Sequence, residues 1–358
     1  MLALRHEEFL AEKRFTAFDG LRAVATLLVF GFHFGGPSCD WLSGWVGVHV
    51  FFALSGFLIT TLALREESAR GRISLANFYV RRLFRIVPAY AVVLALTLVI
   101  GKLNGGPTWD HLHAALPYYL TFMNDFAPRA SFEISWTIGI EQKFYLVWPL
   151  AAFAIVALRP ARIVVTLVLG AVVAYFTFAR GKTFLVHFLV ILEGCLLAIV
   201  MHGRRGFAIV RPLTHPIAAL PVLAAVVVAH LAIPKGIARF GEIKTIALYG
   251  IAVVLLLPTL IGRTPTRFFL AMSPLVAIGK RSYSLYLIQM TASAAASGLI
   301  PAIARNTLIY LAATLAVALV FADVIYRWVE LPLIEQGREI IERRRARRPP
   351  SSILRLRS

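Results

Sequence analysis

The chain has 358 residues, of which 59% are hydrophobic and 15% are charged, and its mean hydropathy is +0.76. A soluble domain carries about 25% charged residues, so this composition excludes an ordinary soluble enzyme and predicts a membrane protein. The formal net charge of +19 does not indicate nucleic-acid binding, because the basic residues gather in short connectors between apolar runs.

Ten apolar runs follow one another along the chain, and each is continuous rather than alternating. Only helices and closed barrels satisfy every backbone hydrogen bond in lipid, and alternation is the mark of barrel strands. We therefore expect an all-α fold, a polytopic membrane protein of about ten transmembrane helices. The runs fall at residues 17–34, 45–64, 83–100, 134–158, 163–178, 184–201, 217–233, 245–261, 281–300 and 307–328.

The connectors between these runs alternate in charge. Lysine and arginine are about threefold more frequent in the N-terminal segment, in every second connector and in the C-terminal tail than in the other connectors. The positive-inside rule then predicts that both termini are cytoplasmic. We expect a membrane-embedded domain over residues 1–335 and a basic cytoplasmic tail over residues 336–358, which would lie against anionic lipid headgroups. The composition is typical of a multi-pass protein of the bacterial cytoplasmic (inner) membrane.

The first run, "FDGLRAVATLLVFGFHF" (residues 18–34), contains Arg22 and, eleven residues later, His33. Eleven residues advance a helix by about 16 Å and rotate it about 20° past full turns, so both side chains project from one stripe. Ionisable groups inside a span usually face a protein interior or a wet cavity. The alternatives are that Arg22 pairs with Asp19 and extends to the interface, and that His33 makes an interhelical hydrogen bond.

The stretch "FYVRRLFRIVPAY" brings three arginines to the start of the third run. Arg82 and Arg85 are three residues apart and share a helix face, and planar guanidinium groups match phosphate oxygens. We interpret Arg81 as a charge that sets the topology. In the second run, His49 is interpreted as structural ahead of functional.

The fourth run opens with "SWTIGIEQKFYLVWP", which places Glu141 about one-third of the way into an apolar helix. An unpaired carboxylate at that depth is costly. Glu141 therefore requires a partner such as Arg22 or His33, or an adjacent aqueous cavity.

In this order, six stretches resemble the acyltransferase type 3 family of membrane acyltransferases. They extend from the first run to the last: "FDGLRAVATLLVFGFHF", "GWVGVHVFFALSGFLI", "FYVRRLFRIVPAY", "ISWTIGIEQKFYLVWP", "IGKRSYSLYLIQ" and "YRWVELPL". The resemblance implies O-acylation, often O-acetylation, of extracytoplasmic glycans or other hydroxylated acceptors, with acyl-coenzyme A as the cytoplasmic donor. It assigns functional weight to the residues matched here by Arg22, His33, Arg82, Arg85 and Glu141.

This chain departs from the family pattern at two residues. Many members carry an acid where this chain has His49, and many carry histidine where it has Gln289. Gln289 does not titrate, so we assign it no proton-transfer role. We also expect no appended esterase-like domain of the kind that some relatives carry, and an acceptor step that needs one would use a partner in glycan assembly.

Together these features predict an acyltransferase of polysaccharide biosynthesis whose catalytic residues are His33 and Glu141. Histidine suits proton exchange near neutral pH, and His33 would act as general base or form a transient acyl-imidazole. Glu141 would orient or charge-balance His33 or Arg22. Arg82 and Arg85 would hold the phosphates of the donor, acetyl-coenzyme A on the family's precedent, and Arg22 would line the path of its pantetheine arm.

Two other functions remain open from the sequence. The same charges would line the path of a transporter or flippase for an anionic lipid-linked saccharide, although no internal repeat is visible. A structural membrane partner of a glycan-assembly complex is the third possibility. No metal-type spacing of cysteine and histidine occurs, so no metal is expected.

Overall fold

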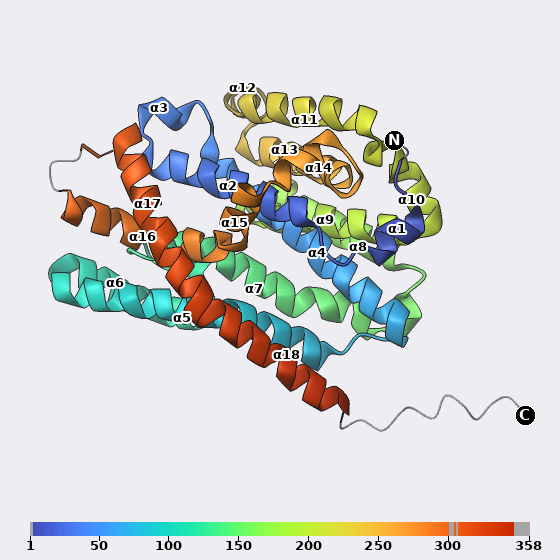
Figure 1. Cartoon of the computed structure of the whole chain (residues 1–358), viewed down its shortest axis with the longest axis horizontal. Helices are drawn as coiled ribbons and strands as arrows, with labels where there is room; N and C mark the ends of the chain where they lie inside the picture. The colour runs from blue at the N-terminus through green and yellow to red at the C-terminus, as the bar shows by residue number, and fades with distance from the viewer. Residues whose placement is uncertain (1–2, 301–303, 306, 347–358) are drawn as a thin grey trace, which may run out of the picture.

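The computed structural model describes residues 3–300, 304–305 and 307–346 (Figure 1). Every regular element in these ranges is helical, which confirms the predicted all-α fold. The α-helices are α1 (His6–Ala11), α2 (Thr16–Phe34), α3 (Pro37–Asp40), α4 (Gly47–Arg70), α5 (Leu75–Asn104), α6 (Gly106–Leu120), α7 (Trp136–Pro149), α8 (Arg162–Ala174), α9 (Val186–His202), α10 (Arg204–Val210), α11 (Pro216–Leu231), α12 (Ile233–Phe240), α13 (Glu242–Ile261), α14 (Pro265–Leu270), α15 (Ser273–Lys280), α16 (Ser282–Leu299), α17 (Leu308–Ile325) and α18 (Leu331–Ala346).

Each of the ten predicted apolar runs forms helix. Within the described ranges, seven helices are long and apolar enough to cross a membrane, and a pair bent by 78° (Arg204–Thr214 with Pro216–Leu231) would make an eighth. Helices α7 and α16 are not among them, and both carry polar residues of the site described below. The structure therefore confirms a polytopic helical membrane protein, and the count of ten spans stays a prediction. The seven are Thr16–Phe34, Gly44–Arg70, Leu75–Asn104, Arg162–Ala179, Thr183–His202, Glu242–Ile261 and Leu308–Ala346.

In the part of the chain that the structure describes, three single π-helical turns interrupt or extend longer helices, at Leu150–Ala154, Tyr175–Ala179 and Tyr326–Glu330. The last one joins α17 to α18, so that the helix from Leu308 to Ala346 is continuous over 39 residues. The predicted boundary between the membrane domain and the tail, at residues 335/336, therefore falls inside α18. There Gly337 packs against Phe84 of α5, whose Cβ would lie 2.8 Å from an added methyl group. Residues 347–358 of the predicted tail lie outside the described residues.

The basic connectors meet at one end of the molecule, where Figure 1 shows α1 and α10, whereas α3 and α6 extend toward the other end. Four glutamates hold the connectors together through ion pairs. This clustering agrees with the alternation of charge in the sequence, and which side of the membrane this end faces stays a prediction. The pairs are Arg204–Glu7 at 3.4 Å, Arg267–Glu12 at 3.5 Å, Arg81–Glu66 at 2.7 Å and Arg162–Glu67 at 3.0 Å.

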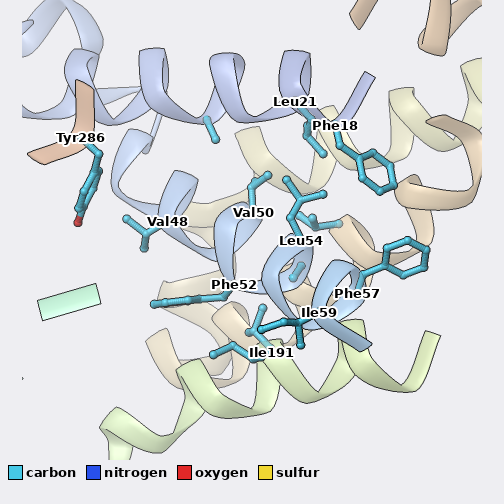
Figure 2. Packing of buried hydrophobic residues seen from close by; sticks show 14 of the residues in the cluster. Phe18, Leu21, Val48, Val50, Phe52, Leu54, Phe57, Ile59, Ile191 and Tyr286 are labelled. Atoms are coloured by element: carbon cyan, nitrogen blue, oxygen red, sulfur yellow. The ribbon is translucent and has the colours of Figure 1, made fainter. Parts of the chain in front are cut away.

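The centre of the molecule is a close packing of α2, α4 and α9 (Figure 2). Phe18 of α2 meets Phe57 of α4 edge to face, with ring centroids 5.7 Å apart. The preceding residue, Gly56, lies so near α9 that an added Cβ would be 2.0 Å from the carbonyl oxygen of Ile191. Gly194 of α9 lies equally close to the backbone of α4. These two glycines let the helix backbones touch, and α4 is thereby fixed as the central wall of the site.

Candidate active site

A cavity of about 390 Å³ lies between α2, α4, α5, α7 and α16. Helix α4 lines it with one face, because its seven lining residues follow the spacing of a single helical stripe. They are Val48, Phe51, Phe52, Ser55, Leu58, Ile59 and Leu62. Fourteen residues of helix span about 21 Å, so the cavity is an elongated channel. Its polar lining residues are Arg14, Asp19, Arg22, Ser55, Arg82, Arg85, Thr137, Glu141, Tyr145, Ser282, Tyr283 and Tyr286.

The charge of this cavity is positive. It contains four guanidinium groups and two carboxylates, a formal excess of two positive charges. Asp19 accepts hydrogen bonds from Arg14 at 2.9 Å and from Arg22 at 3.1 Å. The sequence left open whether Arg22 pairs with Asp19 or faces a cavity. In the structure Arg22 does both. Such a lining favours an anionic ligand.

Arg82 and Arg85 supply the excess charge. Within the described ranges, neither has an acidic partner within 4.0 Å. The guanidinium group of Arg82 lies over the ring of Tyr145, 5.5 Å from its centroid, a cation–π contact that leaves its donors available. Arg81, in contrast, pairs with Glu66 at 2.7 Å and is not among the lining residues. The structure therefore separates Arg81 from its two neighbours, as their spacing on the helix predicts.

Glu141 faces the same cavity and is held by a short hydrogen-bonded chain. The hydroxyl of Ser55 donates to Glu141 Oε1 at 2.5 Å, and the hydroxyl of Tyr145 donates to Ser55 Oγ at 3.0 Å. Arg22 and Arg82 line the same cavity as this carboxyl group. Sequence reasoning missed Ser55 and Tyr145. The signal for Tyr145 was its position four residues after Glu141, on the same helix face.

The residue pair after Glu141 does not belong to the cavity. Consecutive helix positions differ by about 100°, so Gln142 and Lys143 point elsewhere. Lys143 forms an ion pair with Asp125 and lies over the ring of Phe126, 5.1 Å from its centroid. It therefore ties α7 to the segment that follows α6.

His33 lies near the end of α2 and is not among the lining residues of the cavity. Its ring is flanked by Phe32 and Phe34, with centroids 5.1 and 5.9 Å away. Gln289 of α16 lies beside the same ring. Because Tyr286 lines the cavity and Gln289 follows three residues later, one turn of α16 separates His33 from the end of the cavity. Of Arg22 and His33, which share one stripe of α2, only Arg22 lines the cavity.

His49 belongs to a separate buried cluster. Its Nε2 lies 3.2 Å from Nδ1 of His187, and its Nδ1 lies 3.2 Å from the carbonyl oxygen of Val46. The ring of Trp136 stacks obliquely on His187, with centroids 4.8 Å apart. The sequence held no signal for the partner, which is 138 positions away. This arrangement fits a structural role for His49.

The described residues thus define a multi-pass helical membrane protein whose helices enclose an elongated cationic cavity. The family model described as "Acyltransferase domain" (acyltransferase 3) matches residues 15–327. The chain therefore belongs to the acyltransferase 3 family, and the resemblance seen in its motifs is confirmed.

Curated relatives carry related names. The O-acetyltransferase OatA of Staphylococcus aureus (strain NCTC 8325) is 28% identical over 391 aligned positions, which cover 93% of this chain and 59% of the relative. The peptidoglycan O-acetyltransferase OatA of Listeria monocytogenes (serovar 1/2a) is 28% identical over 163 positions, which cover 42% of this chain and 25% of the relative. The chain thus spans about three-fifths of the length of the first relative. No solved structure matches it.

Proposed function

We propose that this protein is a membrane O-acyltransferase that moves an acyl group, acetyl in the first instance, from acyl-coenzyme A to a hydroxyl of a glycan or similar acceptor. One observation carries the proposal: α2, α5 and α7 bring Arg22, Arg82, Arg85 and Glu141 to a single cavity. The names of the relatives, which are O-acetyltransferases, support the acetyl group.

The donor enters from the basic end of the molecule. Arg14, whose side chain is 58% exposed, and the exposed Arg85 mark this mouth of the cavity. The phosphates of coenzyme A bind Arg82 and Arg85, because a guanidinium fork donates to two phosphate oxygens at once. The pantetheine arm then follows the largely apolar face of α4 toward Val48. By the positive-inside rule the mouth faces the cytoplasm, and the protein lies in the bacterial inner membrane.

The transfer forms a bond between the acceptor oxygen and the acyl carbon and breaks the bond from that carbon to sulfur. His33 takes the proton of the acceptor hydroxyl, or first accepts the acyl group on its ring, and the coenzyme A thiolate leaves and is protonated. Because His33 lies one turn of α16 beyond the cavity, the thioester reaches it at the end lined by Tyr286. Glu141, held by Ser55, balances the charge of Arg22 along the path.

The test is donor affinity in purified protein. Arg82→Ala and Arg85→Ala each remove a charge-assisted hydrogen bond, which is worth about 1.5–3 kcal/mol. We therefore expect the KM for acetyl-coenzyme A to rise about 10- to 150-fold. Arg81→Ala is the matched control, since Arg81 is adjacent but pairs with Glu66 outside the cavity, and it should leave KM within about twofold.

Unchanged KM values in both cavity variants would remove the basis of the proposal. Wild-type protein that neither binds acyl-coenzyme A nor releases free thiol with any acceptor would favour the flippase instead. His33→Ala should lose about 10²- to 10⁴-fold in transfer rate, the usual contribution of a general base. Mass spectrometry of cell-envelope glycans from a deletion strain identifies the acceptor. The acceptor is the glycan that has lost an acyl group in that strain.

A further inference from the structure

The two carboxylates of the cavity differ in their partners. Asp19 accepts from both Arg14 and Arg22. Glu141 makes no ion pair within 4.0 Å in the part of the chain that the structure describes. Its Oε1 accepts from Ser55, whereas its Oε2 has no hydrogen-bond partner among the described residues and retains accessible surface. Because Glu141 lines the cavity, this oxygen is open to a ligand.

The hydroxyl groups next to Glu141 supply no donor for Oε2. Ser55 donates to Oε1 at 2.5 Å, and Tyr145 donates to Ser55 Oγ at 3.0 Å. A hydroxyl has one proton to donate, so both protons are already engaged. An ionised carboxylate only accepts hydrogen bonds. Oε2 therefore requires an N–H or O–H group from outside this hydrogen-bonded chain, which water or a ligand supplies.

Tyr145 places this carboxylate beside the proposed phosphate site. The guanidinium group of Arg82 lies over the ring of Tyr145, 5.5 Å from its centroid, and the hydroxyl of the same ring donates to Ser55. Arg82 and Ser55, which holds Glu141, thus contact one tyrosine. In coenzyme A, the pyrophosphate is followed a few bonds along by the hydroxyl and the first amide N–H of the pantetheine arm. The order of groups on the ligand therefore matches their order on the cavity wall.

The wall that α4 contributes around this point is apolar. Of the seven residues with which α4 lines the cavity, Ser55 alone is polar. Burying an amide N–H or a hydroxyl against such a wall without a hydrogen bond is unfavourable. An open carboxylate oxygen at this level offsets that desolvation, which the arginines, being donors only, do not. The cavity thus suits a ligand that is anionic at one end and has a neutral hydrogen-bond donor further along.

We propose that Glu141 binds the pantetheine arm of coenzyme A, with its Oε2 accepting a hydrogen bond from an O–H or N–H group of the arm. This inference rests on the proposed function, in which the phosphates of the donor bind Arg82 and Arg85. Ser55 is the positioning residue, because its hydroxyl engages Oε1 and leaves Oε2 for the ligand. No proton is transferred in this contact, so the role of Glu141 differs from that of His33.

The experiment compares two ligands by titration calorimetry on the purified protein: coenzyme A, and adenosine 3′,5′-bisphosphate, which has no pantetheine arm. Glu141→Ala should lower the ratio of the two affinities about 10- to 150-fold, the loss of one charge-assisted hydrogen bond. The bisphosphate itself should bind no more weakly, because its arginines remain. Glu141→Gln keeps an acceptor oxygen without the charge and should lower the ratio less. Gln142→Leu is the matched control, since Gln142 is adjacent on α7 but does not line the cavity, and it should leave the ratio unchanged.

The outcomes separate this inference from the proposed function. An unchanged ratio in Glu141→Ala overturns the inference, while binding of the bisphosphate and its loss in Arg82→Ala leave the proposed function standing. A lower kcat with an unchanged ratio in Glu141→Gln also overturns it, because Glu141 would then act in the chemical step. Wild-type protein that binds neither ligand overturns both. Binding of the bisphosphate shows that a variant is folded, and if Glu141→Ala is not, Glu141→Gln decides.

Discussion

Replacing Gly56 by alanine should force α4 and α9 apart and disable the cavity. The added Cβ would lie 2.0 Å from the carbonyl oxygen of Ile191, whereas ordinary contact begins at 3.4 Å. The nearest atoms belong to the backbone of α9, so no side chain can rotate away, and the helices must separate by more than about 1 Å. Overpacking of this kind typically costs 1–3 kcal/mol, and with a backbone neighbour we expect about 3 kcal/mol.

The same displacement reaches the site, because Ser55 precedes Gly56 and donates to Glu141 at 2.5 Å. Thermal unfolding in detergent should therefore occur several degrees lower in Gly56→Ala, together with a loss of acyl transfer. Gly170→Ala is the matched control, since nothing lies within 4 Å of its added Cβ, and alanine favours a helix over glycine by up to about 1 kcal/mol. If Gly56→Ala unfolds at the same temperature as Gly170→Ala, the close contact between α4 and α9 does not contribute to stability as we predict.

Two further predictions concern ion pairs. Arg162→Ala should destabilise the protein by about 1.5–3 kcal/mol in thermal unfolding, because the side chain of Arg162 is 7% exposed and binds both oxygens of Glu67 at 3.0 and 3.1 Å. Glu67 keeps a second cationic partner in this variant, Arg159 at 2.9 Å. Removal of the 84% exposed Arg204 should cost at most about 1 kcal/mol, and equal effects would contradict the role of burial. Lys143→Met should speed amide exchange in residues 121–135, because the ion pair with Asp125 is lost, and a changed KM for acetyl-coenzyme A would show that Lys143 belongs to the donor site after all.

Much of the fold was accessible from hydrophobicity alone. All ten apolar runs form helices, because lipid leaves the backbone few other ways to satisfy its hydrogen bonds. The grouping of the basic connectors at one end was equally predictable. Every second connector is rich in arginine, and every second connector between successive spans lies on the same side of the membrane. The convergence of Arg82, Arg85 and Glu141 on one cavity agrees with a simple rule, that charges inside apolar helices must find water or a partner.

Other parts of the site required the tertiary structure. Helical periodicity tells which residues share a face, but not which residues of another helix meet that face. It therefore gave no sign that Ser55 would donate to Glu141, or that His187 would meet His49. Arg22 and His33 share a stripe of α2, yet only Arg22 lines the cavity.

The sequence by itself determined a helical membrane protein with an uneven distribution of charge and a few polar residues too costly to be left in lipid. The tertiary structure decided how those residues divide, with the arginines and Glu141 around one cavity and His33 beside Gln289. The physical reason is that desolvation penalises each polar group individually and locally. The partner that offsets the penalty is chosen by the packing of helices far apart in the chain.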